Sequence, residues 1–265
     1  MDFEEQLASS PRCEGWDFSP FGDRFEEADP PWDYARLAFD AALDAENLLD
    51  MGTGGGEFLH ELITRLGPRA PASISATEAW NPNVPIARTR LALLGVHVSQ
   101  ITTDSSLPYA DAAFDLVINR HEAFDAAEIN RVMRPQATFL TQQVGGEDLQ
   151  ELNELMAAPP AEYAAWSLRS AAQQLTDNGF SIEHAEEARV ATRFTDVGAL
   201  VGFLRAIPWQ IPDFTVERYR DQLRALHDRV QLEGPITAQG HRFLIRARSP
   251  VSGDDAHAQF TARSK

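Results

Sequence analysis

The sequence predicts an α/β fold: a Rossmann-like, doubly wound, mostly parallel sheet of seven strands with helices on both faces. Two observations predict it. Short apolar stretches alternate with amphipathic ones from residue 34 onward, which is typical of a parallel sheet covered by helices. A turn with four glycines at residues 52–56 directly follows the first apolar stretch, as at the ligand-binding end of such a sheet. The chain has 265 residues, of which 43% are hydrophobic, enough to bury a core of this size.

Each element is predicted from its own local pattern. The helix expected at residues 56–66 has Leu59, Leu62 and Leu66 at helical spacing and ends at Gly67, which proline follows. Strands are expected at residues 47–52, 73–79, 96–104, 114–122, 138–146, the start of 181–194, and 241–248. The other helices are expected at residues 34–46, 84–95, 126–135, 168–180 and 217–235.

The regular alternation covers only part of the chain, which suggests added segments around a core. The N-terminal segment is rich in proline, acids and aromatic residues, and it has too many aromatics for a free tail: Trp16, Phe18, Phe21, Trp32 and Tyr34. The stretch before the last strand fits the alternation worst. We therefore expect an N-terminal arm (1–36), a core (37–188), a helical cap (189–235), a final core strand (236–250) and a flexible tail (251–265).

Charge and cysteine content exclude several classes of protein. The formal net charge is −17, whereas binding to nucleic acid or anionic lipid needs clustered lysine and arginine. The single cysteine allows neither an intrachain disulfide nor a cysteine-based zinc cluster. The start, MDFEEQLASS, is acidic where a signal peptide is basic, and the longest apolar run, residues 197–204, is too short for a bilayer. We expect a cytoplasmic protein without a nucleic-acid or membrane partner.

The glycine turn predicts a ligand with positive charge. Its pattern is Asp50-x-Gly52-x-Gly54-x-Gly56. A dinucleotide-binding turn would need a third glycine at position 57 or 59, where this chain has Glu57 and Leu59. A phosphate-binding Walker loop would need a lysine, which the turn lacks. A pyrophosphate is also disfavoured beside Asp50 and Glu57, whereas a sulfonium or ammonium group is favoured there.

With this motif the sequence resembles the class I S-adenosylmethionine-dependent methyltransferases, over about residues 40–145. The resemblance implies that the cofactor is held first by the glycine motif: Asp50, Met51, Gly52, Thr53, Gly54 and Gly56. It implies further contacts at the ends of the next strands: Glu78 and Ala79 at the ribose, Asp104 and Ser105 at the adenine, and Asn119 and Arg120 after the fourth strand. One departure is Pro135-Gln136-Ala137, where the family usually has Pro-Gly-Gly. A left-handed turn residue there would cost glutamine about 1 kcal/mol.

Several of these residues also have a purely structural interpretation. Glu78 can be a solvated loop acid, and Asp104 can cap a turn beside two serines. Gln142 and Gln143 are unusual inside a strand. They either line a pocket or satisfy backbone groups of a loop.

Methyl transfer needs mainly alignment, and it needs a base only when the acceptor must lose a proton. His121, just past the fourth strand, is the natural general base because its pKa lies near neutrality in the unperturbed state. Together with Asn119, Arg120 and Glu122, it is expected to face the methyl group. The alternative is that His121 packs, caps or holds cofactor, and that Glu122 is a helix-start charge. The remaining histidines lack ligand spacing, so no metal is expected.

We expect a small-molecule acceptor, closed in by the aromatic arm and by Phe203, Trp209 and Phe214 of the cap. The same aromatics can instead seal the flanks of the sheet. Two other functions stay open: an S-adenosylmethionine-binding cyclase or binding module without methyl transfer, and an RNA or protein methyltransferase. The arginines of residues 217–229 alternate with acids, which argues against RNA. The sequence assigns no oligomeric state.

Overall fold

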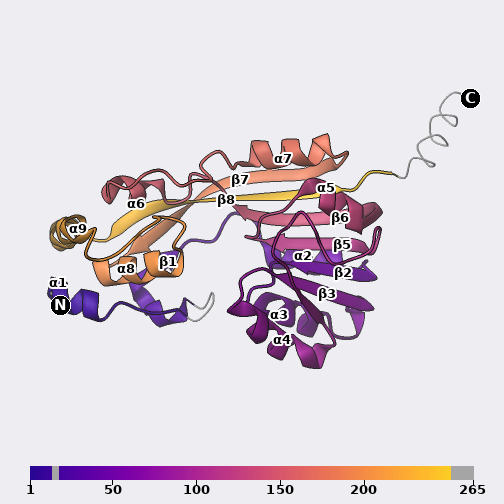
Figure 1. The fold of residues 1–265 in the computed structure, drawn as a ribbon, viewed down its shortest axis with the longest axis horizontal. Coiled ribbons are helices and arrows are strands. Elements are labelled where there is room, and N and C mark those ends of the chain that lie inside the picture. Colours follow the sequence, from indigo (N-terminus) through magenta and orange to yellow (C-terminus); the bar gives the residue numbers. More distant parts are fainter. Residues whose placement is uncertain (14–17, 252–265) are drawn as a thin grey trace, which may run out of the picture. The chain divides into compact units, whose positions relative to one another are not determined.

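A computed structural model describes residues 1–13 and 18–251. Its strands form one eight-stranded sheet in the order β1-β7-β8-β6-β5-β2-β3-β4 (Figure 1). The strands are β1 (Phe25–Glu27), β2 (Asn47–Met51), β3 (Ser73–Glu78), β4 (His97–Gln100), β5 (Phe114–Arg120), β6 (Met133–Val144), β7 (Ser181–Phe194) and β8 (Ile236–Arg248). This arrangement confirms the predicted Rossmann-like α/β fold.

The α-helices lie between the strands, as the alternation predicts. They are α1 (Phe3–Ala8), α2 (Tyr34–Ala42), α3 (Glu57–Leu66), α4 (Asn83–Leu91), α5 (Ala126–Val132), α6 (Gln150–Leu155), α7 (Leu168–Asp177), α8 (Val197–Ala206) and α9 (Arg220–Glu233). Three short 3-10 helices are η1 (Ser19–Arg24), η2 (Gly67–Arg69) and η3 (Ala92–Leu94). Within the described residues, no helix is both long and apolar enough to cross a membrane.

Five adjacent strands, β4-β3-β2-β5-β6, pair in parallel. Leu48, Leu49 and Val117 are fully buried, because a parallel strand has packed layers on both faces. The order of the strands reverses between β2 and β5, where Met51 is paired with Asn119. Ligands of open α/β sheets bind at the carboxyl ends of the strands at such a switch point.

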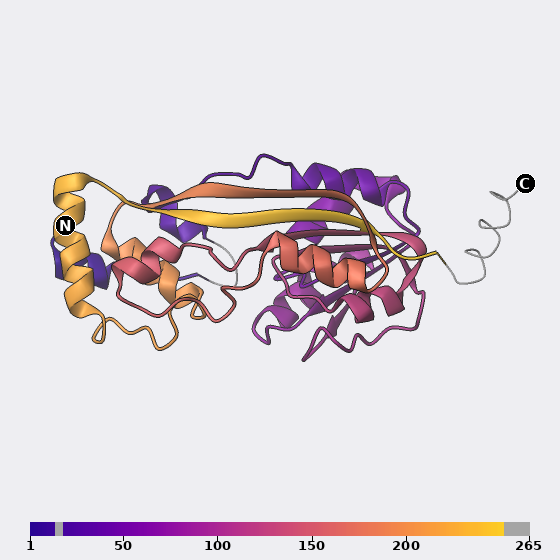
Figure 2. The same ribbon diagram turned by 90° about the horizontal axis from the view of Figure 1, so that it is seen from above.

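The prediction of seven strands is wrong by one. The extra strand, β1, lies in the segment expected to be irregular, and it pairs antiparallel with the end of β7. Three residues are too short to show a strand period. β7 and β8 are also long, and both views show them side by side (Figures 1 and 2).

The chain divides into two compact units, each built from three segments. Unit 1 comprises an N-terminal segment (described at residues 1–13 and 18–32), residues 144–167 and residues 187–242. Unit 2 comprises residues 33–143, residues 168–186 and a last segment described at residues 243–251. The division differs from the predicted segments, because residues 144–167 group with the arm and the cap. β7 and β8 contribute residues to both units.

Unit 1 has a hydrophobic core to which the predicted arm and cap both contribute. Phe21 is 1% exposed, and Phe18, Phe25 and Phe203 form a cluster of rings 5.1–5.8 Å apart. The predicted aromatic residue Trp16 and residues 252–265 of the predicted tail lie outside the described residues. Phe18 and Phe21 of the arm therefore stabilise unit 1 by packing, whereas Tyr34 belongs to unit 2.

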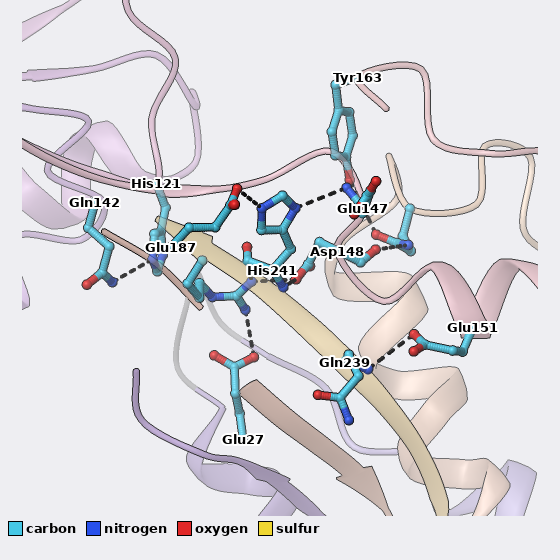
Figure 3. A network of polar contacts seen from close by, with 12 residues as sticks. Glu27, His121, Gln142, Glu147, Asp148, Glu151, Tyr163, Glu187, Gln239 and His241 are labelled. Carbon is cyan, nitrogen blue, oxygen red and sulfur yellow. Dashed lines mark hydrogen bonds and ion pairs between the residues drawn. The ribbon is translucent and has the colours of Figure 1, made fainter. Parts of the chain in front are cut away.

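A polar network in unit 1 surrounds the start of β8 (Figure 3). The Arg242 guanidinium, 6% exposed, pairs with Asp148, which is also 6% exposed, and with Glu27 Oε2 at 2.7 Å. The His241 backbone N–H donates to Asp148 Oδ1 at 2.7 Å, and His241 Nε2 lies 2.8 Å from Glu187 Oε1. Arg242 is thus a buried cation whose charge is balanced by two acids.

The turn before the buried part of β6 is left-handed, although the sequence has glutamine where the family has glycine. Gln136 has a φ of 59°, the left-handed region that glycine would occupy without strain. Its side-chain Nε2 donates to the Ser249 carbonyl at 3.1 Å, and its N–H donates to the Pro250 carbonyl at 3.3 Å. These bonds hold the glutamine in the strained turn. β6 begins at Met133, before the turn, where the sequence predicts the end of a helix.

Candidate functional site

The glycine turn joins the end of β2 to the start of α3 within unit 2. Gly52, Gly54 and Gly56 have φ of 67°, 63° and 82°. Side chains strain such conformations. Space is also tight at one of them: a Cβ on Gly52 would lie 2.4 Å from Glu122 Cβ. At these glycines the turn has no side chain of its own, so that a ligand can approach the backbone closely at the switch point.

Glu78, at the end of β3, holds the glycine turn in place. Its Oε2 accepts the Gly54 backbone N–H at 2.6 Å, and its Oε1 accepts the Trp80 backbone N–H at 2.7 Å. The side chain is buried, at 2% exposure for the residue. Each carboxylate oxygen keeps a second lone pair, so Glu78 can still accept hydrogen bonds from a ligand.

Four carboxyl groups gather around this turn: Asp50, Glu78, Asp104 and Glu122. Burial raises the pKa of Asp50 to about 7, although Thr53 and Arg120 act against it. Burial likewise raises the pKa of Glu122 to about 7, and the charges of Asp104 and Glu78 add to the shift. Burial also raises the pKa of Glu78 and Asp104.

The positive charge near these four acids is too small to balance their negative charge. Arg120 is the cation that acts on Asp50, and the other three carboxyl groups have one another as neighbours. Asp104 Oδ1 is buried and has no hydrogen-bond partner within the described chain. In that same part of the chain, no three His, Cys, Asp or Glu side chains are placed to hold a metal ion. These residues fit an organic ligand that carries positive charge and hydrogen-bond donors.

The end of β5 is fixed by a second set of hydrogen bonds. Asn119 Oδ1 accepts from Thr141 Oγ1 at 2.8 Å and from Gln143 Nε2 at 2.6 Å, while its buried Nδ2 has no partner among the described residues. Tyr34 donates its hydroxyl to the Asn119 carbonyl at 3.0 Å. Gln143 also donates to the Glu122 carbonyl at 2.8 Å, which shows that it satisfies loop backbone. These contacts place Asn119 and Glu122 beside the glycine turn.

His121 follows β5 and is exposed to solvent. Its φ is 66°, an unusual conformation for a residue with a side chain. Gln142 Nε2 lies 2.9 Å from His121 Nε2, so that the ring nitrogen accepts the amide proton (Figure 3). The His121 N–H donates to the Gln142 carbonyl at 2.8 Å. Backbone strain of this kind is concentrated at functional sites.

Aromatic rings line the other side of Arg120. Its guanidinium lies 4.7 Å from the centre of the Phe58 ring, which is itself 5.4 Å from the Tyr34 ring. The positive charge of Arg120 lowers the pKa of Asp50, and the negative charge of Asp50 raises the pKa of Tyr34. Tyr34 is therefore part of the site, although the sequence analysis assigns it to the arm.

The structure brings together most of the residues expected to bind the cofactor. The turn from Asp50 to Gly56, including the buried Met51 and Thr53, lies beside Glu78 and the end of β5. Ala79 and Ser105 are exposed. The sequence does not indicate Tyr34 as a residue of this site. The alternative that Glu122 is a helix-start charge is wrong, because α5 begins at Ala126 with Asp125 as its cap.

Known proteins with similar sequences or folds support this picture. Residues 49–141 match the family model described as a methyltransferase domain. A provisionally assigned methyltransferase of Bacillus halodurans is 20% identical, with a TM-score of 0.58 over 83% of this chain and 99% of that one. YcgJ of Bacillus subtilis is 18% identical, with a TM-score of 0.57 over 82% and 98%. The [4+2]-cyclase SpnF is 18% identical, with a TM-score of 0.52 over 94% and 92%. Among curated proteins, no significant match is found.

The fold, the glycine turn at the switch point and the match over residues 49–141 support a methyltransferase domain in this part of the chain.

Proposed function

We propose that the chain is an S-adenosylmethionine-dependent methyltransferase that acts on a small molecule. The observation that carries the proposal is the group of four carboxyl groups around the glycine turn, of which Asp50 and Glu78 are buried and Asp104 and Glu122 are half-buried. The proposed cofactor-binding residues are those that the sequence resemblance implies: Asp50, Met51, Gly52, Thr53, Gly54, Gly56, Glu78, Ala79, Asp104, Ser105, Asn119 and Arg120. We add Tyr34 and Glu122 to this set, because Tyr34 contacts Asn119 and Glu122 lies against Gly52.

Each group has a role that follows from its contacts. The bare backbone of the turn admits the ligand, and Glu78 orders the turn while keeping lone pairs for hydroxyl groups. Asp104 offers a buried acceptor to an amino group. When bound, the cofactor supplies a methyl group on positively charged sulfur; the acceptor's electron pair forms the new bond to carbon, and the old bonding pair stays on sulfur.

Binding of S-adenosylmethionine is expected to tighten as the pH rises from 6 to 8. In the unliganded protein Asp50 and Glu122 have pKa values of about 7, so both carry protons at pH 6. A cationic ligand favours the ionised carboxylates, and binding below pH 7 must expel those protons. For each group that titrates, the dissociation constant should fall about tenfold over this range. Calorimetry in buffers of different ionisation enthalpy measures both the affinity and the protons released.

The same pKa values make the opposite prediction for the unliganded fold. A carboxyl group whose pKa is higher in the folded than in the unfolded chain binds more protons when folded. The stability that it contributes is therefore lost as the pH rises from about 4 to 7. An affinity that is flat or stronger at pH 6 would contradict the assignment of these carboxyl groups to the cofactor site.

We propose His121 as the group that accepts a proton from the acceptor. Its exposed ring, held by Gln142, stands at the carboxyl end of β5. His121→Ala is expected to lower the turnover rate by about 10²–10⁴-fold, the usual contribution of a general base, with little change in cofactor affinity. The measurement is formation of S-adenosylhomocysteine, and His60→Ala on α3 serves as the control. A defect confined to cofactor binding would remove His121 from the chemistry.

The acceptor class is proposed from charge. The chain has a formal net charge of −17, and the arginines of α9 are taken up by acids: Arg220 and Arg224 pair with Glu4, and Arg229 pairs with Glu233. Little basic surface is left for RNA. The direct test incubates the protein with S-adenosylmethionine and a panel of metabolites and measures S-adenosylhomocysteine. RNA and protein acceptors are the comparison.

A second candidate function is a reaction without methyl transfer. SpnF has a similar fold and is a [4+2]-cyclase. This function predicts tight binding of S-adenosylmethionine without any formation of S-adenosylhomocysteine, which the same assay measures.

A further inference from the structure

Glu122 has a position that the methyltransferase motifs do not assign. It follows β5, and its side chain lies directly against the glycine turn: a Cβ on Gly52 would be 2.4 Å from Glu122 Cβ and 2.9 Å from Glu122 Oε2. Its backbone carbonyl is held by Gln143 Nε2 at 2.8 Å. The carboxyl group thus lies against the glycine turn on which the cofactor is proposed to lie.

The surroundings of this carboxyl group are negative. Asp104 and Glu78 are the charged groups that act on it, from the segment after β4 and from the end of β3. Glu78 acts in turn on Asp50, and the positive charge of Arg120 also acts on Asp50. Glu78 differs from Glu122 because its two oxygens already accept backbone N–H groups. The backbone N–H of Ala123 is the group that lowers the pKa of Glu122, so the ionised form of this carboxyl group depends on charge brought by a ligand.

We propose that Glu122 is the residue by which the site distinguishes the cationic S-adenosylmethionine from the product S-adenosylhomocysteine, whose sulfur is uncharged. This inference rests on the proposed function. With the sulfonium present, the ionised carboxylate is favoured. After transfer that positive charge has left the cofactor, and Glu122 again lies among like charges, so the product is held less tightly.

Burial and the neighbouring acids raise the pKa of Glu122 to about 7, which agrees with this role. A carboxyl group with that pKa is half ionised near neutrality. A modest change in local charge is then enough to change its protonation state. The contribution to cofactor affinity should be largest above pH 7.

The test is calorimetric titration of the full chain with each of the two ligands at pH 8. Glu122→Gln keeps the shape of the side chain and removes the charge. It is expected to weaken S-adenosylmethionine about tenfold, a typical value for one nearby charge pair, and to change S-adenosylhomocysteine less than about twofold. Glu122→Asp should keep the preference for the cation. Glu61→Gln, an exposed acid on α3, is the matched control.

The outcomes separate the inference from the function on which it rests. If Glu122→Gln weakens both ligands equally, Glu122 acts by packing and the inference fails. An unchanged ratio of the two affinities overturns it as well. If the parent protein binds neither ligand, the proposed function fails together with the inference. Thermal melting of each variant shows whether a lost affinity comes from lost folding.

Discussion

Gly52→Ala is expected to reduce the affinity for S-adenosylmethionine by more than about tenfold, which corresponds to 1.4 kcal/mol. The added Cβ would lie 2.4 Å from Glu122 Cβ, so either the turn or the loop after β5 must move. The residue also has a φ of 67°, where alanine is strained. Left-handed strain and overpacking together should lower the free energy of unfolding by about 2–5 kcal/mol. Calorimetry and urea denaturation measure the two effects.

Gly95→Ala separates strain from close approach. Gly95 also has a positive φ, of 71°, but a Cβ there would meet nothing within 4 Å. The variant should lose only the strain energy, about 1–2 kcal/mol, and bind cofactor like the parent. If Gly52→Ala folds and still binds with parental affinity, the turn is not the cofactor site.

Arg242→Met is expected to destabilise unit 1 by about 3–5 kcal/mol, the usual cost of leaving a buried charge without its partner. Arg242 and Asp148 are each 6% exposed, and Arg242 also holds Glu27. Without the guanidinium, Asp148 keeps the His241 N–H as a donor but has no counter-charge. The measurement is the urea-dependent loss of folded signal at pH 7.

The matched control is Arg229→Met. Arg229 pairs with Glu233 on the surface of α9, with side chains 48% and 65% exposed. An exposed pair of this kind contributes less than about 1 kcal/mol. Replacing both charges, with Arg242→Met and Asp148→Leu, should recover part of the lost stability, since no buried carboxylate remains unpaired. If Arg242→Met and Arg229→Met lower the free energy of unfolding equally, burial does not determine how much the Arg242 pair contributes to stability.

The parallel part of the sheet could be predicted from the sequence because its signals are local. Leu48 and Leu49 lie in an apolar stretch that ends at a glycine turn, and that pattern needs no information from the rest of the chain. The start of β8 is different. Its first residues, Ile236–Gly240, lack a continuous apolar run, and their strand form depends on pairing with neighbouring strands.

The candidate site shows the same limit. Residues within one motif, such as Asp50 and Gly52, could be predicted because their spacing is itself the signal. Tyr34 could not, since its hydroxyl meets the Asn119 carbonyl 85 positions later in the chain. For Glu122 the sequence indicates a place just past the fourth strand but not the contact with Gly52. Only the fold brings it to Gly52, and the shift of its pKa comes from burial and from acids on two other strand ends.

The division of each unit into three chain segments has a consequence for how the protein is made. Unit 1 needs residues up to 242, and unit 2 needs the last residues of β8, which come after them. During synthesis, unit 1 cannot be completed before residue 242 has left the ribosome, and unit 2 cannot be completed before the end of β8 has done so. Contacts between such distant segments also slow folding. A stop codon before β8 would therefore remove a strand from both units at once, and no single cut in the chain separates one unit from the other.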